Sequence, residues 1–414
     1  MKKSNHLLPK LVLTFICVCM PVVSGQESAA PFSDLFNEIS GIAEAQFYDG
    51  DFIAAKFPAI RSRYLKRLPE IEHEREFRNF INEMLGEFNT SHTQYYSQDQ
   101  PEYYQLAAIF QRVPVVDSLF NHTDVTYATA GILTRQIGDN HFIYSVLSGS
   151  AADSAGLLAG DEILSVNSRP FEPFLSLKDF IGRTVMFKIL RSADGLPQDI
   201  PVTVQAVNPK TEFLEAEKAS ISIIETSGFK IGYIHIWSYA GEEYHRAFTD
   251  AIAFGALKDA DALIWDLRYG WGGANPSYLD VFNRKVPVLN TIDRDGGVIS
   301  FDQHWRKPAV MLADGTVRSG KEVLAYGFKK YGFGKIIGEN TAGAVVAGRI
   351  NVLSNGALLY LASRNALVDG EVLEGTGVAP DIHVPMNIRY LQGKDLQKDA
   401  AIDYLEKLLT SGKN

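Results

Sequence analysis

The stretch Val310-Met311-Leu312-Ala313-Asp314-Gly315-Thr316-Val317-Arg318-Ser319-Gly320-Lys321-Glu322 decides the fold of this chain. It predicts a short apolar strand over residues 310–312, a polar turn, and a helix from residue 323 to about residue 330. A serine at such a turn sits at a sharp bend, beside N–H groups that a helix start leaves unpaired. Ser319 is therefore a candidate hydrolase nucleophile. The alternative is an N-cap, the ordinary role of a serine before a helix.

Strand and helix patterns alternate around this stretch, from about residue 219 to residue 386. Short apolar runs predict buried strands at residues 231–236, 262–267, 309–312 and 335–338, and residues 244–255 have the spacing of a helix. Such alternation is typical of an α/β fold with a largely parallel sheet. An amphipathic helix is predicted over residues 396–409, within a C-terminal segment of residues 387–414.

The composition indicates a globular protein. The 414 residues are enough for about two or three domains. The hydrophobic share of 46% and the charged share of 21% are ordinary. The formal net charge is −9 and no run of Lys and Arg stands out, which argues against nucleic acid as a partner.

Residues 1–25 have the pattern of a secretory signal: a basic start, an apolar run over residues 11–20 that is too short to span a bilayer, and small residues before Gln26. We expect an exported protein, periplasmic or extracellular after cleavage, that meets a membrane only if the segment stays uncleaved. Both cysteines, Cys17 and Cys19, lie in this segment. The mature chain would hold no thiol, which excludes thiol catalysis and disulfides. An exported protein without disulfides fits the bacterial periplasm.

Two regions precede the α/β part. Residues 31–104 are predicted as an N-terminal helical domain, because apolar residues recur at three- and four-residue intervals, and residues 89–111 look like a connector. From residue 125 to residue 208 the pattern changes to short strands and turns. Here a short Ala-rich helix ends at Gly156, a Gly160-Asp161 turn follows, and a strand comes next. The glycines fit positions that need a left-handed backbone.

This pattern resembles the PDZ-domain signature. PDZ domains add a peptide C-terminus as a strand to a sheet edge and hold its carboxylate with backbone N–H groups. By resemblance, Ala130-Gly131-Ile132-Leu133 is the carboxylate loop, with Gly131, Ile132 and Leu133 as the binding residues. The alternative is a PDZ fold that acts only as a spacer or lid.

Three stretches of the α/β part follow the PDZ-like region in a fixed order. They are Trp265-Asp266-Leu267-Arg268 with Gly272-Gly273, then Arg318-Ser319-Gly320-Lys321-Glu322, then Gly375-Thr376-Gly377-Val378-Ala379-Pro380-Asp381. This organisation resembles the tail-specific, or C-terminal-processing, serine peptidases, the family that includes the tricorn core. The resemblance covers nearly the whole chain after the signal segment. It implies a crotonase/ClpP-like α/β protease core with an inserted, mostly β PDZ domain and an N-terminal helical domain.

The family has two catalytic designs. Its processing-peptidase branch pairs the Ser with a Lys base in a Thr-x-Gly-Lys context, but the corresponding stretch here ends in Ala344, which cannot take a proton. Its tricorn branch takes a His base from a Ser-His pair ahead of the PDZ or lid region, and Ser91-His92 stands at that place. Imidazole suits a general base because its pKa lies near neutral. The resemblance therefore implies Ser319 as nucleophile and His92 as base.

In the tricorn pattern a Ser and a Glu extend the relay behind the His, and Ser91 and Glu374 match them. Their task would be to fix the tautomer of His92 and to stabilise its cation. The alternatives are a surface or capping role for His92 and a solvated loop carboxylate for Glu374.

An oxyanion hole needs two N–H donors aimed at one point. We expect one from Gly320 and the other from the Gly272-Gly273 turn, with Gly272 favoured; the alternative for the pair is a tight turn that requires a positive φ. Tricorn carries an acidic residue directly after its nucleophile, where this chain has Gly320. Substrate preference at that subsite therefore does not transfer.

The sequence predicts neither metal nor cofactor. The chain has no His-Glu-x-x-His pair, and His235, His245, His304 and His383 lie apart. The sequence thus predicts an exported serine endopeptidase or processing peptidase whose PDZ domain recruits or gates polypeptide C-termini. One alternative is a non-catalytic binding protein on the same scaffold, for an apolar ligand or a peptide C-terminus. The other is an adaptor that acts through its PDZ domain alone.

Overall fold

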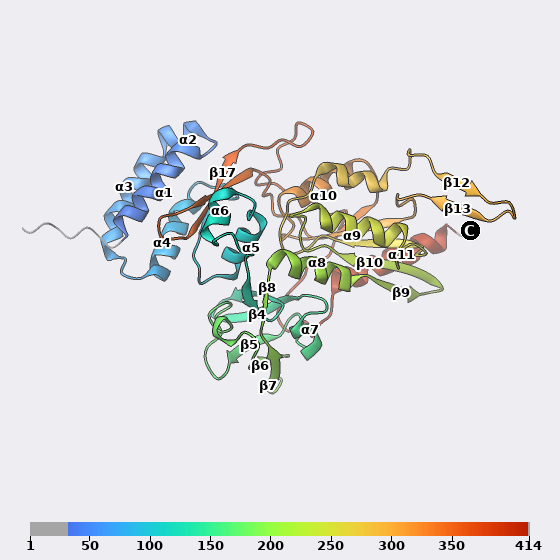
Figure 1. Ribbon diagram of the computed structural model, residues 1–414, viewed down its shortest axis with the longest axis horizontal. Helices are drawn as coiled ribbons and strands as arrows, with labels where there is room; N and C mark the ends of the chain where they lie inside the picture. Colours follow the sequence, from blue (N-terminus) through green and yellow to red (C-terminus); the bar gives the residue numbers. More distant parts are fainter. Residues whose placement is uncertain (1–31, 413–414) are drawn as a thin grey trace, which may run out of the picture.

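The computed structural model of the protein describes residues 32–412, so the predicted signal segment lies outside the described residues. The N-terminal helices lie at one end, the β domain projects to one side, and the α/β part forms the other end (Figure 1). Within residues 32–412, no helix combines the length and the apolar character needed to cross a membrane.

A six-stranded sheet forms the centre of the α/β part, in the order β18-β15-β14-β11-β10-β9. Every neighbouring pair is parallel except β9 with β10, as the alternating pattern predicts. The strands are β9 (Ser222–Thr226), β10 (Phe229–His235), β11 (Ala262–Asp266), β14 (Ala309–Ala313), β15 (Lys335–Gly338) and β18 (Ile382–His383). The helices around them are α8 (Pro209–Ser220), α9 (Glu242–Ala253), α10 (Gly320–Lys330) and α11 (Leu396–Ser411).

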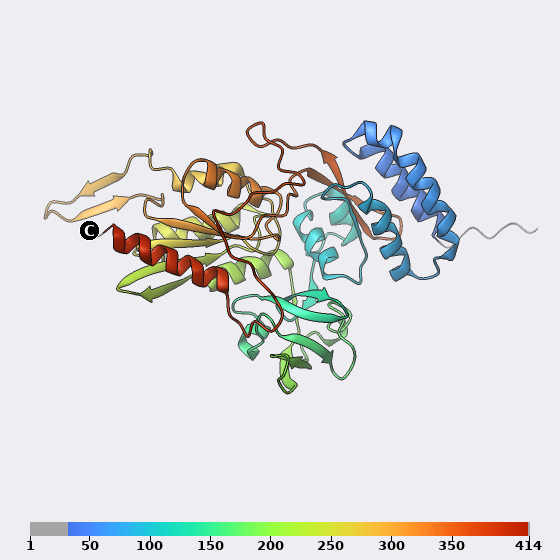
Figure 2. The same cartoon turned by 180° about the vertical axis from the view of Figure 1, so that it is seen from behind.

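Both faces of this sheet are covered. Successive residues of a strand point to opposite faces, so a strand between two layers is apolar throughout. Leu263 and Trp265 of β11 pack in the cluster that includes residues of α8, α9 and α10. Ile264 packs on the other face with Ala401 and Leu405 of α11, the helix that crosses the back of the molecule in Figure 2.

The four N-terminal helices pack on a small separate sheet of order β1-β17-β16. The helices are α1 (Ser33–Gln46), α2 (Gly50–Ala55), α3 (Phe57–Arg67), followed by the short 3-10 turn η1 (Leu68–Glu70), and α4 (Glu74–Gly86). The strands β16 (Ala347–Val352) and β17 (Leu358–Arg364) come from the far end of the chain, and Leu359 lies in the same core as Phe77. The helices therefore share their core with the C-terminal part of the chain.

The predicted connector over residues 89–111 is wrong in part. It contains β1 (Gln94–Tyr96), which pairs with β17, and α5 (Pro101–Ile109); α6 (Pro114–Leu119) follows. A three-residue strand carries too little periodicity to be recognised, and its partner lies far along the chain. This pairing fixes the segment that carries His92, two residues before β1.

The β domain has the predicted PDZ features. A five-stranded sheet of order β3-β4-β5-β6-β7 lies beside a two-stranded pair, β2 with β8. The helix α7 ends at Gly156 with φ +79°, and Gly160 has φ +93°, as the sequence predicts. The elements are β2 (Tyr127–Thr129), β3 (Ile132–Ile137), β4 (Asn140–Val146), α7 (Ala151–Ala155), β5 (Glu162–Val166), η2 (Lys178–Phe180), β6 (Thr184–Leu190), β7 (Gln198–Thr203) and β8 (Gln205–Val207). The strand β3 lies at the edge of its sheet.

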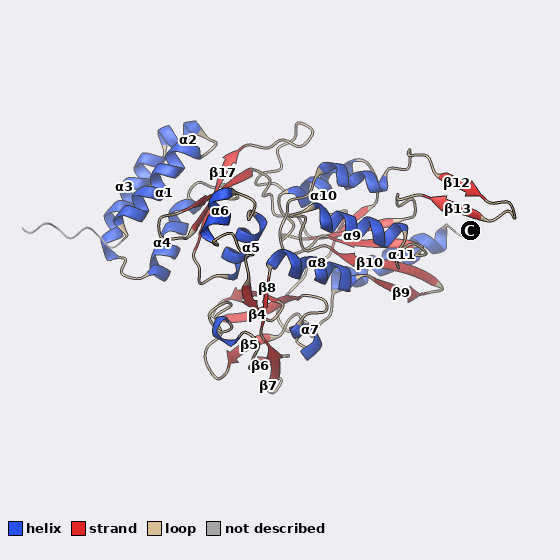
Figure 3. Ribbon diagram, viewed as in Figure 1, coloured by secondary structure: helices blue, strands red, loops and turns tan. Residues whose placement is uncertain are grey.

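A β-hairpin extends from the α/β part beyond the central sheet (Figure 3). It consists of β12 (Leu289–Ile292) and β13 (Val298–Phe301) and follows the 3-10 helix η3 (Pro276–Phe282). Its tip carries Arg294, which is exposed.

Candidate active site

Ser319 occupies the turn between β14 and α10. Its backbone angles, φ +57° and ψ −131°, lie where residues other than glycine are rarely found. Its hydroxyl does not cap α10, so the N-cap alternative does not describe it. Its amide donates to the carbonyl of Ala344 at 2.8 Å. A strained turn thus presents a serine hydroxyl that has no structural role in the helix, as at a nucleophile elbow.

Two backbone amides adjoin Ser319 without an acceptor among residues 32–412: those of Gly272, in the loop after β11, and Gly320, the first residue of α10. A Cβ on Gly272 would lie 2.6 Å from the Cβ of Ser319 and 3.3 Å from the amide nitrogen of Gly320. Gly272 must be glycine because Ser319 itself fills the space. Gly273 is different: its φ is +97°, so the turn explanation fits it.

Ser91, His92 and Glu374 form one hydrogen-bonded chain. The Oγ of Ser91 donates to Oε2 of Glu374 at 3.1 Å and lies 2.8 Å from Nδ1 of His92. Because the hydroxyl proton points to Glu374, we assign the proton of the ring to Nδ1, which donates to Ser91 Oγ. This leaves Nε2 as the basic nitrogen of His92, and it has no hydrogen bond within the described chain.

Glu374 is held by donors on every side, so it is not a solvated loop carboxylate. Its Oε1 accepts the amide of Ser91 at 2.7 Å and the hydroxyl of Thr90 at 3.3 Å. Its Oε2 also accepts the amides of Val345 at 2.8 Å and Val346 at 3.1 Å. Burial opposes ionisation of this carboxyl, but the N–H groups of Ser91, Val346 and Val345 lower the pKa of Glu374 below its usual value.

His92 is buried, with 7% of its surface exposed, and its ring packs edge-on against Tyr360 with 5.2 Å between centroids. Its backbone is also left-handed, with φ +54°. Burial and, after it, the charge of Arg318 lower the pKa of His92 to about 4, and Glu374 opposes this. The ring is therefore neutral at neutral pH, the state that a general base needs.

The segment of residues 344–346 joins Ser319 to the hydrogen-bonded chain of Ser91, His92 and Glu374. The carbonyl of Ala344 binds the amide of Ser319, and the next two amides bind Glu374. No hydrogen bond joins Ser319 Oγ to the His92 ring in the part of the chain that the structure describes. Catalytic hydrogen bonds of this kind commonly tighten only when substrate is bound.

Two buried charged residues, Lys321 and Glu322, follow Gly320 and hold the loops around Ser319, although the sequence predicts no role for them. The Nζ of Lys321 donates to the carbonyls of Trp237 at 2.9 Å, Leu267 at 3.2 Å and Tyr269 at 2.9 Å. It thereby supports the loop that carries Gly272.

Glu322 holds the loop of residues 341–344, which also contacts Ser319. Its Oε1 accepts from Thr341 Oγ1 at 2.6 Å and from the amide of Gly343 at 2.7 Å, and its Oε2 accepts the amide of Ala344 at 2.6 Å. Helix periodicity could have shown from the sequence that Lys321 is buried, because it lies one turn before the buried Leu324. A buried lysine on an apolar helix face needs hydrogen-bond acceptors, which the three carbonyl groups supply.

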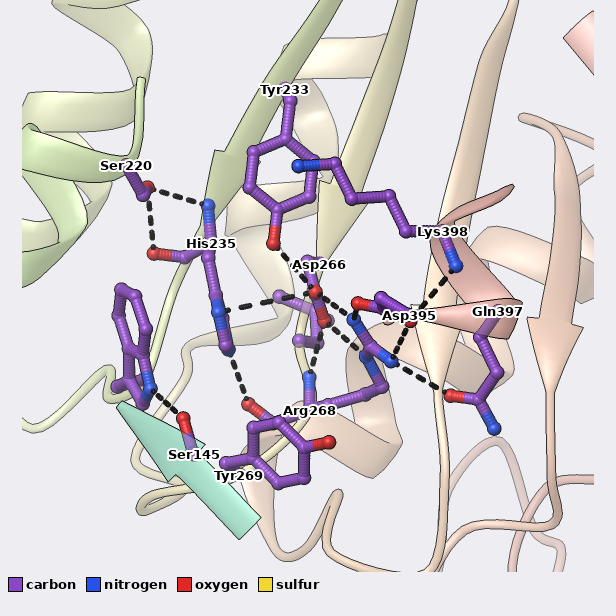
Figure 4. Close-up of polar contacts among 12 residues, drawn as sticks. Ser145, Ser220, Tyr233, His235, Asp266, Arg268, Tyr269, Asp395, Gln397 and Lys398 are labelled. Carbon is purple, nitrogen blue, oxygen red and sulfur yellow. Dashed lines mark hydrogen bonds and ion pairs between the residues drawn. The ribbon is translucent and has the colours of Figure 1, made fainter. Parts of the chain in front are cut away.

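A buried ionic network holds the start of the loop that carries Gly272, at Arg268 (Figure 4). Arg268 donates to both oxygens of Asp266, at 2.9 and 2.6 Å, and to both oxygens of Asp395, at 3.0 and 2.6 Å. It also donates to Gln397 at 3.0 Å. His235 donates from Nε2 to the carbonyl of Arg268 at 2.9 Å. The start of α11 is thus tied to the residue that leads into the loop.

The predicted carboxylate loop lies on a cleft that extends to Trp271 and Arg318, the residues before Gly272 and Ser319. Gly131 has φ +83°, and its amide already donates to Thr129 Oγ1 at 2.9 Å. Ile132 and Leu133 begin the edge strand β3 and line a cleft of about 330 Å³ together with Trp271 and Arg318 of the α/β part. The PDZ loop and the residue before Ser319 therefore face one space.

The remaining histidines lie in separate settings. His245 stacks on Tyr278 with 4.0 Å between centroids, and His304 contacts Asp302 at 3.1 Å. Between residues 32 and 412, no group of three or more His, Cys, Asp or Glu side chains is arranged to hold a metal ion.

Comparison with known proteins finds three matching domain families along the chain. Residues 28–86 match the tricorn protease C1 domain, residues 142–191 match a PDZ domain, and residues 230–384 match peptidase family S41. The chain carries a peptidase family S41 domain. The expected resemblance to tricorn and the C-terminal-processing peptidases is confirmed.

Individual relatives are distant. Tricorn protease homolog 1 of Streptomyces coelicolor is 22% identical over 407 residues, which are 91% of this chain and 35% of that protein. A carboxyl-terminal-processing protease of Synechocystis sp. is 25% identical over 291 residues, 65% of each chain. The crystal structure of the tricorn protease has the same fold, with a TM-score of 0.54 and 19% identity, over 91% of this chain and 36% of that one. This chain spans about a third of the length of its tricorn-type relatives.

Proposed function

We propose that this chain is a serine peptidase in which Ser319 is the nucleophile and His92 the general base. One observation carries the proposal: a strained serine whose hydroxyl caps no helix stands beside two amides, those of Gly272 and Gly320, that have no acceptor among the described residues. Free amides beside an uncapped hydroxyl are what a tetrahedral oxyanion requires. A serine that serves only the fold would use its hydroxyl in the helix start.

In the proposed reaction, Nε2 of His92 takes the proton of Ser319 Oγ while that oxygen attacks the peptide carbonyl. The oxyanion accepts hydrogen bonds from the amides of Gly272 and Gly320. The C–N bond then breaks, the leaving amine takes the proton from Nε2, and an acyl-enzyme remains. Nε2 next takes a proton from water, the resulting hydroxide attacks the ester, and the proton returns to Ser319. Through Ser91, Glu374 keeps the proton of the ring on Nδ1 and stabilises the imidazolium.

A lysine base is a poor alternative in this site. The position that would hold it is Ala344, whose backbone is engaged with Ser319 and Glu322. Lys321 lies two residues after Ser319, and burial lowers its pKa to about 7, within the range of a general base. Its Nζ, however, donates to three carbonyl groups, so it has no lone pair directed at Ser319.

We further propose polypeptide substrates that enter through the cleft between the PDZ domain and the active site. The edge strand β3 and the shared cleft support recruitment by the PDZ domain. The signal-like pattern of residues 1–25 supports export, with a periplasmic or extracellular location.

The test combines covalent labelling with peptide hydrolysis. A fluorophosphonate probe is expected to label the wild-type protein and an exposed-serine control, Ser300→Ala, but not Ser319→Ala. His92→Ala is expected to lose roughly 10²–10⁴-fold or more in kcat/KM. The exposed His122→Ala serves as its control, because that ring lies on the surface.

Circular dichroism shows whether each variant is folded. Undiminished hydrolysis by folded His92→Ala would remove the assigned base. A folded wild-type protein that takes no label and cleaves no peptide would instead be a binding protein on this scaffold.

A further inference from the structure

Arg318 is a cation that lines the cleft and has no anionic partner among the described residues. It directly precedes Ser319 and is half-buried. Its guanidinium forms no hydrogen bond or ion pair with any residue from 32 to 412, whereas the fully buried Arg268 binds two carboxylates. Glu102 lines the same cleft but does not pair with Arg318. A half-buried arginine normally meets a carboxylate or another acceptor, because its five N–H groups are costly to desolvate alone.

The position of this guanidinium is fixed by its neighbours. It lies over the ring of Trp271, with 5.5 Å to the centroid. The indole Nε1 in turn donates to Oε1 of the buried Gln105 at 2.9 Å. The charged group therefore lies over an aromatic ring that a hydrogen bond to Gln105 holds in place.

The charge of Arg318 acts on several buried rings around it. Burial raises the pKa of Tyr360 to about 12, and the charge of Arg318 opposes this; the same two influences act on Tyr96 and Tyr144. Arg318 also helps to keep His92 neutral. An unpaired positive charge among aromatic rings attracts an anion more strongly than one in open water.

We propose that Arg318 binds a carboxylate of the peptide substrate in this cleft; the proposal rests on the peptidase function above. The carboxylate is either that of the peptide C-terminus or that of an Asp or Glu side chain close to the scissile bond. Arginine suits it because its planar fork matches the two oxygens of a carboxylate. The PDZ loop lines the same cleft of about 330 Å³, so an extended peptide along β3 would bring its carboxylate near this group.

Binding must be measured apart from turnover, because Arg318 also acts on the proposed base. The host is therefore Ser319→Ala, which keeps the cleft and cannot form an acyl-enzyme. Two pairs of fluorescent peptide pools with randomised upstream residues are compared by anisotropy at low salt. One pair differs only in a C-terminal carboxylate or amide. The other pair is amidated throughout and differs in Glu or Gln near the C-terminus.

In at least one pair, the peptide with the carboxylate is expected to bind about tenfold more tightly than its neutral counterpart. Arg318→Gln is expected to bring the ratio of the two dissociation constants close to one. Arg318→Lys is expected to retain part of the ratio, because it keeps the charge but loses the fork. The matched control Arg294→Gln removes the same charge from the exposed hairpin tip and is expected to leave the ratio unchanged. The pair that responds identifies the source of the carboxylate.

Two results would overturn the inference: equal binding within both pairs, or a carboxylate preference that survives in a folded Arg318→Gln protein. The second would assign the carboxylate to the PDZ loop alone. The labelling experiment on the active serine separates this failure from failure of the proposed function. Labelling without carboxylate preference refutes only the role of Arg318, whereas preference without labelling leaves a carboxylate-binding protein that is not a peptidase.

Discussion

The acid limb of the pH–rate profile should move in opposite directions when the two charges beside His92 are removed one at a time. The pKa of His92 is lowered from 6.5 to about 4, a difference of about 2.5 pH units, or about 3 kcal/mol against the charged ring. Burial contributes most, Arg318 adds to it, and Glu374 opposes it. Arg318→Gln removes a repelling cation, so the limb should move to higher pH, by less than the full 2.5 units. Glu374→Gln removes an attracting anion, so the limb should move lower.

The assay is kcat/KM from about pH 3 to pH 8, because this ratio reports ionisations of the free enzyme. The substrate is an amidated peptide without acidic side chains, so that carboxylate binding does not enter the measurement. The wild-type limb is expected near pH 4, well below that of a solvated imidazole, and Arg294→Gln should not move it. A wild-type limb near pH 6.5 would refute the buried setting of the base. A downward shift in Arg318→Gln would refute the electrostatic account.

Three further substitutions test the loops around the nucleophile. Gly272→Ala places a methyl group 2.6 Å from the Cβ of Ser319, so kcat for peptide hydrolysis should fall about 10²–10³-fold in a folded protein. The control Gly86→Ala, where a Cβ meets nothing within 4 Å, should change kcat little in the same assay. Lys321→Met leaves three carbonyl groups without their donor. We expect it to lower kcat by a larger factor than it raises KM, and to lower the free energy of unfolding in urea by about 3 kcal/mol. An unchanged kcat would count against the positioning role of Lys321. Arg268→Met leaves two carboxylates unpaired and should cost about 3–5 kcal/mol by the same measurement, so a loss below about 1 kcal/mol would contradict the network.

The local part of the site could be predicted from sequence because its signals are local. The strand-to-helix turn at Ser319 and the glycine pair at Gly272 are read from a few neighbouring residues, and backbone geometry ties each to a limited set of uses. The link from Ser91 and His92 to Glu374 came from family resemblance. No propensity connects residues so far apart in the chain.

What the sequence could not provide depends on long-range pairing. The strand β1 was overlooked because it is short and its partner β17 belongs to the other end of the chain. No role was predicted for Lys321 and Glu322, because their partners are carbonyl and amide groups of other loops. The partnerless state of Arg318 is likewise visible only once every neighbour is in place.

The pairing of β1 with β17 also bears on how the protein is made. The ribosome releases Ser91, His92 and Ser319 before Glu374, and β1 has no partner strand until residues 358–364 have followed. A chain that ends before residue 358 therefore lacks Glu374, the proposed acid, and the strand that pairs with β1 beside His92. If the proposed relay is right, hydrolysis requires both the strand β17 and Glu374, so it cannot begin before these residues have been synthesised.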